Sequence, residues 1–134
     1  MTELKTIFKY QFEVRGYELD SFGHVNNAVY LNYMEQARWE IIKMLKLHEL
    51  FRSKESFLVV VEANIKFINE LRLFDKAEIT TKMHKRGFFL DFKQDIHLGK
   101  KKIAKATIKC LFVDKQRSPL DIPDVITPYL HEQD

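Results

Sequence analysis

Hydrophobic and polar residues alternate along most of this chain, and in one long stretch they follow a helical period instead. Residues 8–15 place Phe8, Tyr10 and Phe12 on one side of the backbone, as a half-buried β-strand requires. The same alternation predicts strands at residues 59–67, 76–83, 88–98 and about 103–114. The last stretch is apolar on both sides in places, which is typical of a strand in the interior of a sheet or across an interface.

The helical period begins after the first strand. From Tyr30 onward the apolar residues recur at helical spacing and form one broad stripe: Tyr30, Tyr33, Met34, Ala37, Ile41, Met44 and Leu45. Asn26 or Asn27 is the expected N-cap, because an asparagine side chain can accept a hydrogen bond from a backbone N–H of the first turn. We expect His48, Glu49 and Leu50 to lie near the end of the helix or just past it, before a polar connection at residues 51–56.

This order of elements predicts an α+β domain in which an antiparallel sheet of about five strands wraps one long helix. The strands after the helix are expected to be joined by hairpins, with a turn at Arg86–Gly87. Residues 1–134 are expected to form a single domain. One helix cannot cover a sheet completely, so the open edges favour a homodimer, or a homotetramer built from two dimers.

Composition narrows the class of protein further. With 46% hydrophobic and 31% charged residues the chain has the usual balance of a folded domain. It has no apolar run of membrane-spanning length and no signal-peptide pattern, so we expect a cytoplasmic location. The net charge of +3 does not by itself indicate nucleic acid, and no nucleic-acid motif is found. The histidines share no metal-ligand spacing, and we expect no metal and no cofactor.

Candidate chemistry is concentrated where the helix begins. Asp20, Gly23, His24, Asn26 and Asn27 fall within eight consecutive positions just before the apolar stripe. A helix start presents unpaired backbone N–H groups and a partial positive charge, so it can bind a carbonyl oxygen or a phosphate. From the residues alone, Asp20 is either a catalytic carboxylate or a turn residue whose side chain caps a neighbouring N–H.

These residues, with those that flank them, resemble a known family, the hotdog-fold acyl thioesterases of the 4-hydroxybenzoyl-CoA thioesterase type, which include bacterial acyl-CoA thioesterases. The matching positions are Arg15, Asp20, Gly23, His24, Val25, Asn26, Asn27, Tyr30, Glu35, Ala37 and Arg38. The His-Val-Asn-Asn-x-x-Tyr part also looks like plant acyl-carrier-protein thioesterases. The order of elements agrees over essentially the whole chain.

The resemblance implies a hotdog fold and hydrolysis of an acyl-CoA to free acid and coenzyme A. It implies that Asp20 acts as nucleophile or general base while helix N-terminal amides polarise the thioester carbonyl. His24 and Asn27 would assist, and Gly23, Val25, Asn26 and Tyr30 would contact substrate. His24 could instead only hold the turn, Asn26 and Asn27 could only hold the turn and the helix cap, and Tyr30 could be a core residue. The open alternatives are an acyl-carrier-protein substrate, or a non-hydrolytic acyl-thioester binding or hydratase-like protein.

Some positions depart from the family pattern or lie outside it. Glu18 replaces the first aspartate of the motif, and Phe67 and Glu70 replace a tyrosine and a proline that shape the cleft in relatives. Glu35 and Arg38 lie three apart on the helix and are expected to pair. Basic residues at the end of the third strand, Lys85 and Arg86 together with Lys82, are candidates for the phosphates of coenzyme A, although an exposed hairpin explains them as well.

Overall fold

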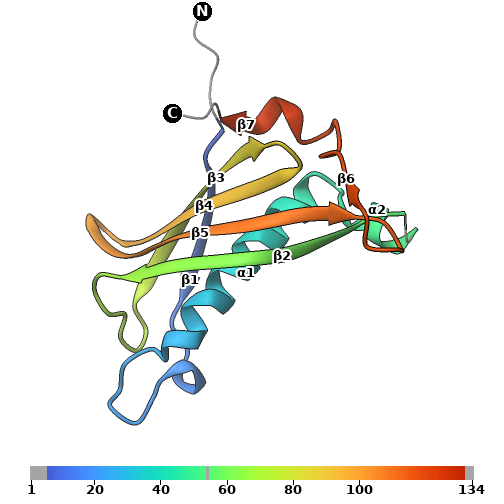
Figure 1. Ribbon diagram of the computed structural model, residues 1–134. Coiled ribbons are helices and arrows are strands. Elements are labelled where there is room, and N and C mark those ends of the chain that lie inside the picture. The colour runs from blue at the N-terminus through green and yellow to red at the C-terminus, as the bar shows by residue number, and fades with distance from the viewer. Residues whose placement is uncertain (1–5, 54, 132–134) are drawn as a thin grey trace, which may run out of the picture.

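A computed structural model describes residues 6–53 and 55–131 of the chain (Figure 1). Strand β1 (Phe8–Glu13) precedes the long helix α1 (Asn27–Met44), and four long strands follow. These are β2 (Phe57–Phe67), β3 (Lys76–Arg86), β4 (Phe89–Leu98) and β5 (Lys101–Val113). The short elements are the 3-10 turns η1 (Gly16–Glu18) and η2 (Thr127–Tyr129), helix α2 (His48–Arg52), and strands β6 (Pro119–Leu120) and β7 (Leu130–His131). The predicted α+β class with one long helix is confirmed.

The five long strands form one sheet in the order β1-β3-β4-β5-β2, and all neighbours among them are antiparallel. The prediction that hairpins join all the strands after the helix is wrong for β2. This strand pairs with β5 rather than β3, so it lies at the edge opposite β1. Residues 68–75 therefore cross from one edge towards the other, and β5 lies in the sheet interior as predicted (Figure 1).

The core lies between α1 and the sheet face on which it packs. Alternate residues of β3 and β4 are buried there, as the period of a strand requires: Ala77, Ile79, Thr81, Met83, Leu90, Phe92, Gln94 and Ile96. The buried residues of α1 are Tyr30, Tyr33, Met34, Ala37, Arg38, Ile41 and Ile42. The predicted stripe is wrong at Met44, which is 63% exposed. Leu45 lies four residues after Ile41 and is buried, so Met44, about 100° away around the helix, turns outward.

Helix α1 ends at Met44, so His48, Glu49 and Leu50 lie just past its end, as predicted. The backbone of Lys46 adopts φ +58°, and Leu47 N–H donates to the carbonyl of Ile42, which closes the helix. The chain then forms the short helix α2, whose last residues fall in the predicted polar connection. No helix of the described residues is long and apolar enough to cross a membrane.

Strand β2 is an open edge of the sheet. Among the described residues no strand pairs with its outer side. Val59, Val60, Val61 and Phe67 are 37% to 52% exposed, although these residue types are usually covered. An eleven-residue apolar strand with unpaired backbone groups is a template for pairing with another strand.

The core predicts a measurable difference between two phenylalanines of one hairpin. Replacing Phe92 by Ala leaves a cavity beneath α1 and should lower the free energy of unfolding by about 3–5 kcal/mol in a urea titration. Phe88→Ala is the matched control because Phe88 is 48% exposed, and it should change stability by about 0.5 kcal/mol or less. Equal losses for the two variants would contradict this placement of the core.

Candidate active site

The loop before α1 is closed by the side chain of Asp20. Its Oδ1 accepts hydrogen bonds from the backbone N–H of Phe22 (2.9 Å) and of His24 (3.1 Å). The backbone N–H of Asp20 donates to the His24 carbonyl at 2.7 Å, so the two residues hold the turn from both sides. Gly23 takes φ +80° inside this turn, which a residue with a side chain rarely adopts. The turn role considered for Asp20 is therefore present.

The turn role uses only one of the two carboxylate oxygens of Asp20. Oδ2 of Asp20 accepts no hydrogen bond from any described residue, and the side chain is exposed in the single chain. Asp20 therefore holds the loop with one oxygen and has the other available. Its position in the turn is compatible with either role considered for it.

The start of α1 leaves one backbone donor available. Asn26 is the N-cap, and its Oδ1 accepts from the N–H of Ala28 at 3.1 Å. The N–H of Asn26 donates to the Glu18 carbonyl, and that of Val29 to the Asn26 carbonyl. The N–H of Asn27 has no acceptor among the described residues. It lies at the positive end of an 18-residue helix, where a carbonyl oxygen that gains negative charge is stabilised.

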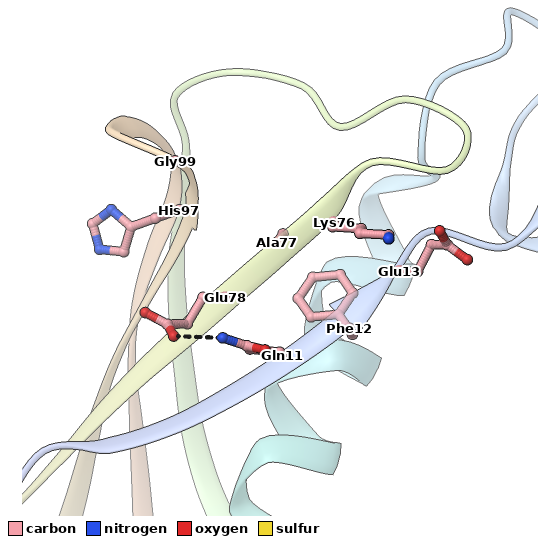
Figure 2. A pocket seen from close by; sticks show the side chains of 8 residues that line it. All are labelled: Gln11, Phe12, Glu13, Lys76, Ala77, Glu78, His97 and Gly99. Atoms are coloured by element: carbon pink, nitrogen blue, oxygen red, sulfur yellow. Dashed lines mark hydrogen bonds between the residues drawn. The ribbon is translucent and has the colours of Figure 1, made fainter.

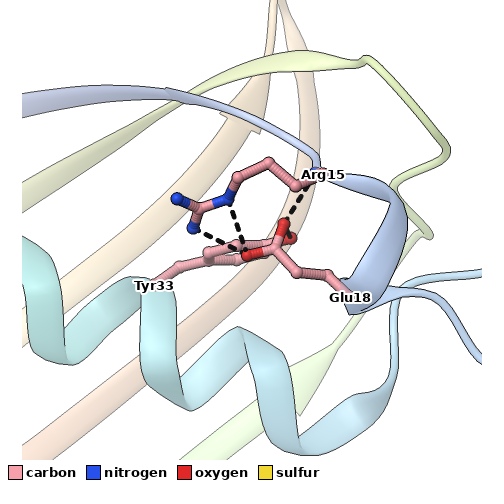
Figure 3. Close-up of polar contacts among 3 residues, drawn as sticks. All are labelled: Arg15, Glu18 and Tyr33. Atoms are coloured by element: carbon pink, nitrogen blue, oxygen red, sulfur yellow. Dashed lines mark hydrogen bonds and ion pairs between the residues drawn. The ribbon is translucent and has the colours of Figure 1, made fainter.

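A buried carboxylate fixes this loop against the helix (Figure 3). Glu18 is 5% exposed and accepts four hydrogen bonds. Three come from Arg15, from its backbone N–H (2.8 Å), Nε (3.1 Å) and one Nη (2.7 Å), and the fourth from the hydroxyl of Tyr33 (2.8 Å). We call Arg15, Glu18 and Tyr33 the Glu18 cluster. It joins the end of β1, the turn η1 and the second turn of α1.

The pKa shifts in the Glu18 cluster keep Glu18 ionised and Tyr33 protonated. Burial acts to raise the pKa of Glu18, but the hydrogen bonds from Arg15 and Tyr33 outweigh burial and hold that pKa below its usual value. Burial, with the hydrogen bond to the Glu18 carboxylate, raises the pKa of Tyr33, so this phenol stays a donor. The ion pair between Arg15 and Glu18 is stable at neutral pH.

The β2–β3 connection completes the surroundings of the loop. Val25 N–H donates to the Leu71 carbonyl at 3.3 Å, and Leu71 N–H donates to the Tyr30 hydroxyl at 3.0 Å. His24 Nε2 lies 3.4 Å from Oε2 of Glu70. Sequence reasoning did not include Glu70 in the site. The signal was its departure from the family pattern, but only the crossing of residues 68–75 brings it beside His24.

The predicted site residues separate into three groups. Asp20, Gly23, His24, Asn26 and Asn27 come together in the loop. Val25 and Tyr30 belong to the same segment, but their side chains are 3% and 2% exposed and pack in the core. Burial raises the pKa of Tyr30, and the nearby charges of Glu70, Asp20 and Asp75 raise it further.

Lys85 and Arg86 form the third group and are not part of this loop. They lie at the end of β3, roughly 30 Å along the strand from its start beside the loop. Arg86 is engaged by Asp91, with 3.0 Å between one Nη and Oδ2. One chain therefore gives no geometric support for their binding the phosphates of a ligand held at Asp20, and that role stays a prediction.

A hollow of about 550 Å³ opens between β1, β3 and the β4–β5 hairpin (Figure 2). Glu13, Lys76 and His97 line it, together with Gln11 and Glu78, whose side chains share a hydrogen bond of 3.3 Å. None of the predicted site residues reaches this hollow. It presents no donor at a helix start, and it is not the candidate active site.

Comparisons with known proteins find similar thioesterases. The profile of the Thioesterase-like superfamily matches residues 14–130. The chain is 34% identical over 122 residues to the acyl-acyl carrier protein thioesterase ATL3 of Arabidopsis thaliana, covering 87% of this chain and 63% of that protein. It is 37% identical over 73 residues to the long-chain acyl-CoA thioesterase FadM of Escherichia coli K12, covering 54% of this chain and 55% of that protein. The chain thus spans less than two thirds of these relatives.

Solved structures agree as well. The probable thioesterase YbaW of Escherichia coli superposes with a TM-score of 0.80 at 29% identity, covering 90% of this chain and 95% of that one. Slr0204 of Synechocystis, a 1,4-dihydroxy-2-naphthoyl-CoA thioesterase, superposes with a TM-score of 0.85 at 16% identity, covering 92% and 96%. At that identity the likeness concerns the fold. The predicted hotdog fold is confirmed.

The Glu18 cluster predicts how stability depends on pH. Because the pKa of Glu18 is lower in the folded than in the unfolded protein, its contribution is complete above the usual glutamate pKa of about 4.3 and is lost as the pH falls through the folded value. Glu18→Gln should lower the free energy of unfolding at pH 7 by about 1–3 kcal/mol. It should also flatten the decline below pH 5 in urea titrations.

Glu13→Gln is the matched control, because Glu13 is an exposed glutamate at the end of β1. It should leave both the stability at pH 7 and its decline in acid unchanged. The same pH dependence in the Glu18 variant and the parent would exclude Glu18 as the group that titrates.

Proposed function

This chain belongs to the thioesterase-like superfamily, and from that premise we propose that it hydrolyses an acyl-CoA to a free acid and coenzyme A. The observation that carries the proposal is that the loop leading into α1 leaves two groups available. One is Oδ2 of Asp20, and the other is the backbone N–H of Asn27. A carboxylate and a polarising donor are the two groups that thioester cleavage needs.

The carboxylate can act in two ways. As nucleophile, Oδ2 of Asp20 forms a bond to the thioester carbon, the carbonyl electrons move to oxygen, and their return breaks the C–S bond to release the thiolate. The resulting anhydride is cleaved by water into the free acid and the Asp20 carboxylate. As general base, Asp20 takes a proton from water while that water attacks the carbon, and the proton then passes to the departing thiolate. Either route gives the same products.

The neighbouring groups have supporting roles in this proposal. The N–H of Asn27, with the positive end of α1, stabilises the oxyanion. His24 orients the thioester or gives a proton to the thiolate, and Oε2 of Glu70 lies 3.4 Å from its Nε2. Asn26 holds the first turn of the helix through its capping bond, and Gly23 lets the loop backbone approach substrate.

The alternative substrate is an acyl group on an acyl-carrier protein. One observation favours it: the similarity to ATL3 extends over 87% of this chain, whereas the similarity to FadM extends over 54%. Thiol release from matched acyl-CoA and acyl-carrier-protein substrates distinguishes the two. A binding or hydratase-like protein would leave the thioester intact in the same assay.

We further propose that two copies pair through their β2 edges. The support is the open apolar edge, which in a monomer would expose both backbone groups and valine side chains to water. Antiparallel pairing of β2 with the β2 of a second copy would continue the sheet and give a two-fold dimer.

Asp20→Asn tests the catalytic proposal. We expect kcat for thiol release from acyl-CoA to fall by a factor of order 10² or more, because asparagine is neither a nucleophile nor a base at this position. Asp114→Asn is a close control. Oδ1 of Asp114 also accepts from the N–H groups two and four residues on, those of Gln116 and Ser118, both at 2.9 Å. If both variants kept full activity, Asp20 would have only a turn role.

Val61→Asp tests the proposed dimer. A carboxylate in the middle of the β2 edge should be costly to cover, so we expect a shift from dimer to monomer in sedimentation equilibrium at micromolar concentration. Val125→Asp is the control, since Val125 is similarly exposed at 44% but lies outside the sheet. A parent chain that is monomeric under these conditions would refute the pairing.

A further inference from the structure

Arg38 is a buried cation with a rigid support. Its side chain, in the middle of α1, is 9% exposed, and Nη1 donates to Oε1 of Gln94 at 2.9 Å. Gln94 is fully buried, and its Nε2 donates to the Met34 carbonyl (3.0 Å) and lies 3.1 Å from Oγ1 of Thr81. These bonds fix the orientation of Gln94, and Gln94 fixes that of the guanidinium.

This cation forms no ion pair with a carboxylate in the described part of the chain. The expected pair with Glu35 is wrong, because Glu35 is exposed and no carboxylate lies within 4.0 Å of the guanidinium. The reason is that Gln94 of β4 holds the side chain towards the sheet. Burial lowers the pKa of Arg38, although the charge of Glu35 acts to raise it, and an arginine stays protonated in a protein. A buried unpaired charge is costly, and such a charge in a fold is a candidate for function.

Arg38 lines a small cavity of about 80 Å³ between α1 and the β2 edge. Glu35 also lines the cavity. The remaining walls are largely apolar and are formed by Trp39, Ile42, Phe51, Leu58, Val60 and Cys110. Burial raises the pKa of the Cys110 thiol to about 11, so Cys110 adds no negative charge. The volume corresponds to two or three water molecules at roughly 30 Å³ each, which is the size of one small functional group.

The cavity lies within reach of the helix start along α1. From Asn27 to Arg38 the helix rises about 16 Å. In the first turn of α1, the ring of Tyr30 contacts that of Phe67 on β2, with 5.5 Å between the ring centroids. An acyl chain of medium length that extends along α1 from a thioester at Asp20 would end near Arg38.

We propose that this cavity receives the far end of the acyl group, and that Arg38 binds an oxygen carried there, a carboxylate in preference to a hydroxyl. The proposal rests on the proposed function for the position of the thioester. A carboxylate would form the ion pair that Glu35 does not form, and it accepts charge-assisted hydrogen bonds from the guanidinium. The apolar walls alone would favour a plain chain.

Matched acyl-CoA pairs test this specificity. We would compare octanoyl, decanoyl and dodecanoyl-CoA with the chains of the same length that end in a carboxylate or a hydroxyl, and read thiol release. At the length that reaches Arg38 we expect kcat/KM to be about tenfold or more higher for the carboxylate-ended chain than for the plain one. Arg38→Met should reverse this preference, and Arg52→Met, an exposed arginine of α2, should not. Glu35→Gln should increase it by removing a nearby negative charge.

A binding measurement decides the proposal without hydrolysis. Free dodecanedioate should raise the melting temperature of the parent protein more than dodecanoate does, and this difference should disappear in Arg38→Met. Equal effects of the two acids on the parent, or an unchanged difference in Arg38→Met, would overturn the inference and leave a cavity filled by water. Absence of thiol release from every acyl-CoA with the dodecanedioate effect intact would instead refute the proposed function alone.

Discussion

The hydrogen bonds to the Glu18 carboxylate are the interaction on which the candidate site depends. They tie the end of β1 to the second turn of α1, and the loop that carries Asp20 leaves directly from this point. The backbone of the same residue accepts from Asn26 N–H, so Glu18 also fixes where the helix begins. A carboxylate so buried is tolerated only when its oxygens are satisfied, and here four donors satisfy them. The loop geometry thus follows from a buried carboxylate, paired with the exposed Arg15, two residues before Asp20.

A second constraint is that only one long helix packs on a sheet whose main strands are β1 to β5. α1 covers the centre of one face and leaves the β2 edge open. The same edge borders the cavity at Arg38 through Leu58 and Val60. Whatever pairs with β2 would therefore also border that cavity. The proposed pairing of two copies and the proposed acyl recognition therefore both involve β2, while the catalytic proposal concerns the start of α1.

Local features of this fold could be predicted from the sequence, and long-range ones could not. The capping of α1 by Asn26 and the alternation in β3 and β4 depend on neighbouring residues, so the patterns indicated them. The position of β2 depends on which distant strand it pairs with, and alternation carries no such information. The helical spacing of Glu35 and Arg38 permits a pair, but Gln94, 56 residues after Arg38, is the partner.

In the candidate site, too, the residues that are adjacent in sequence could be predicted, and those brought in by long-range contacts could not. The residues between Asp20 and Asn27 are adjacent in sequence, and their gathering in one loop was predictable. Glu70 joins them only through the crossing from β2 to β3. Lys85 and Arg86 were chosen for charge at the end of a strand, but the pattern does not say at which end of the sheet that strand finishes. Glu18 was noticed as a departure from a motif, and its four hydrogen bonds are visible only in the fold.

One contact has a consequence for the topology of the whole chain. The parallel pairing of β7 with β3 brings His131 beside Thr6, where its Nε2 meets the Thr6 carbonyl. Thr6 and His131 lie at the end of the sheet away from the Asp20 loop, because β1 starts after Thr6 and runs towards that loop (Figure 1). A short link from position 131 to position 6, made in place of the residues outside them, would close the backbone into a ring. The order of strands in space does not depend on where that ring is opened, so circular permutants cut at the Gly99 turn are compatible with the same architecture and the same candidate site.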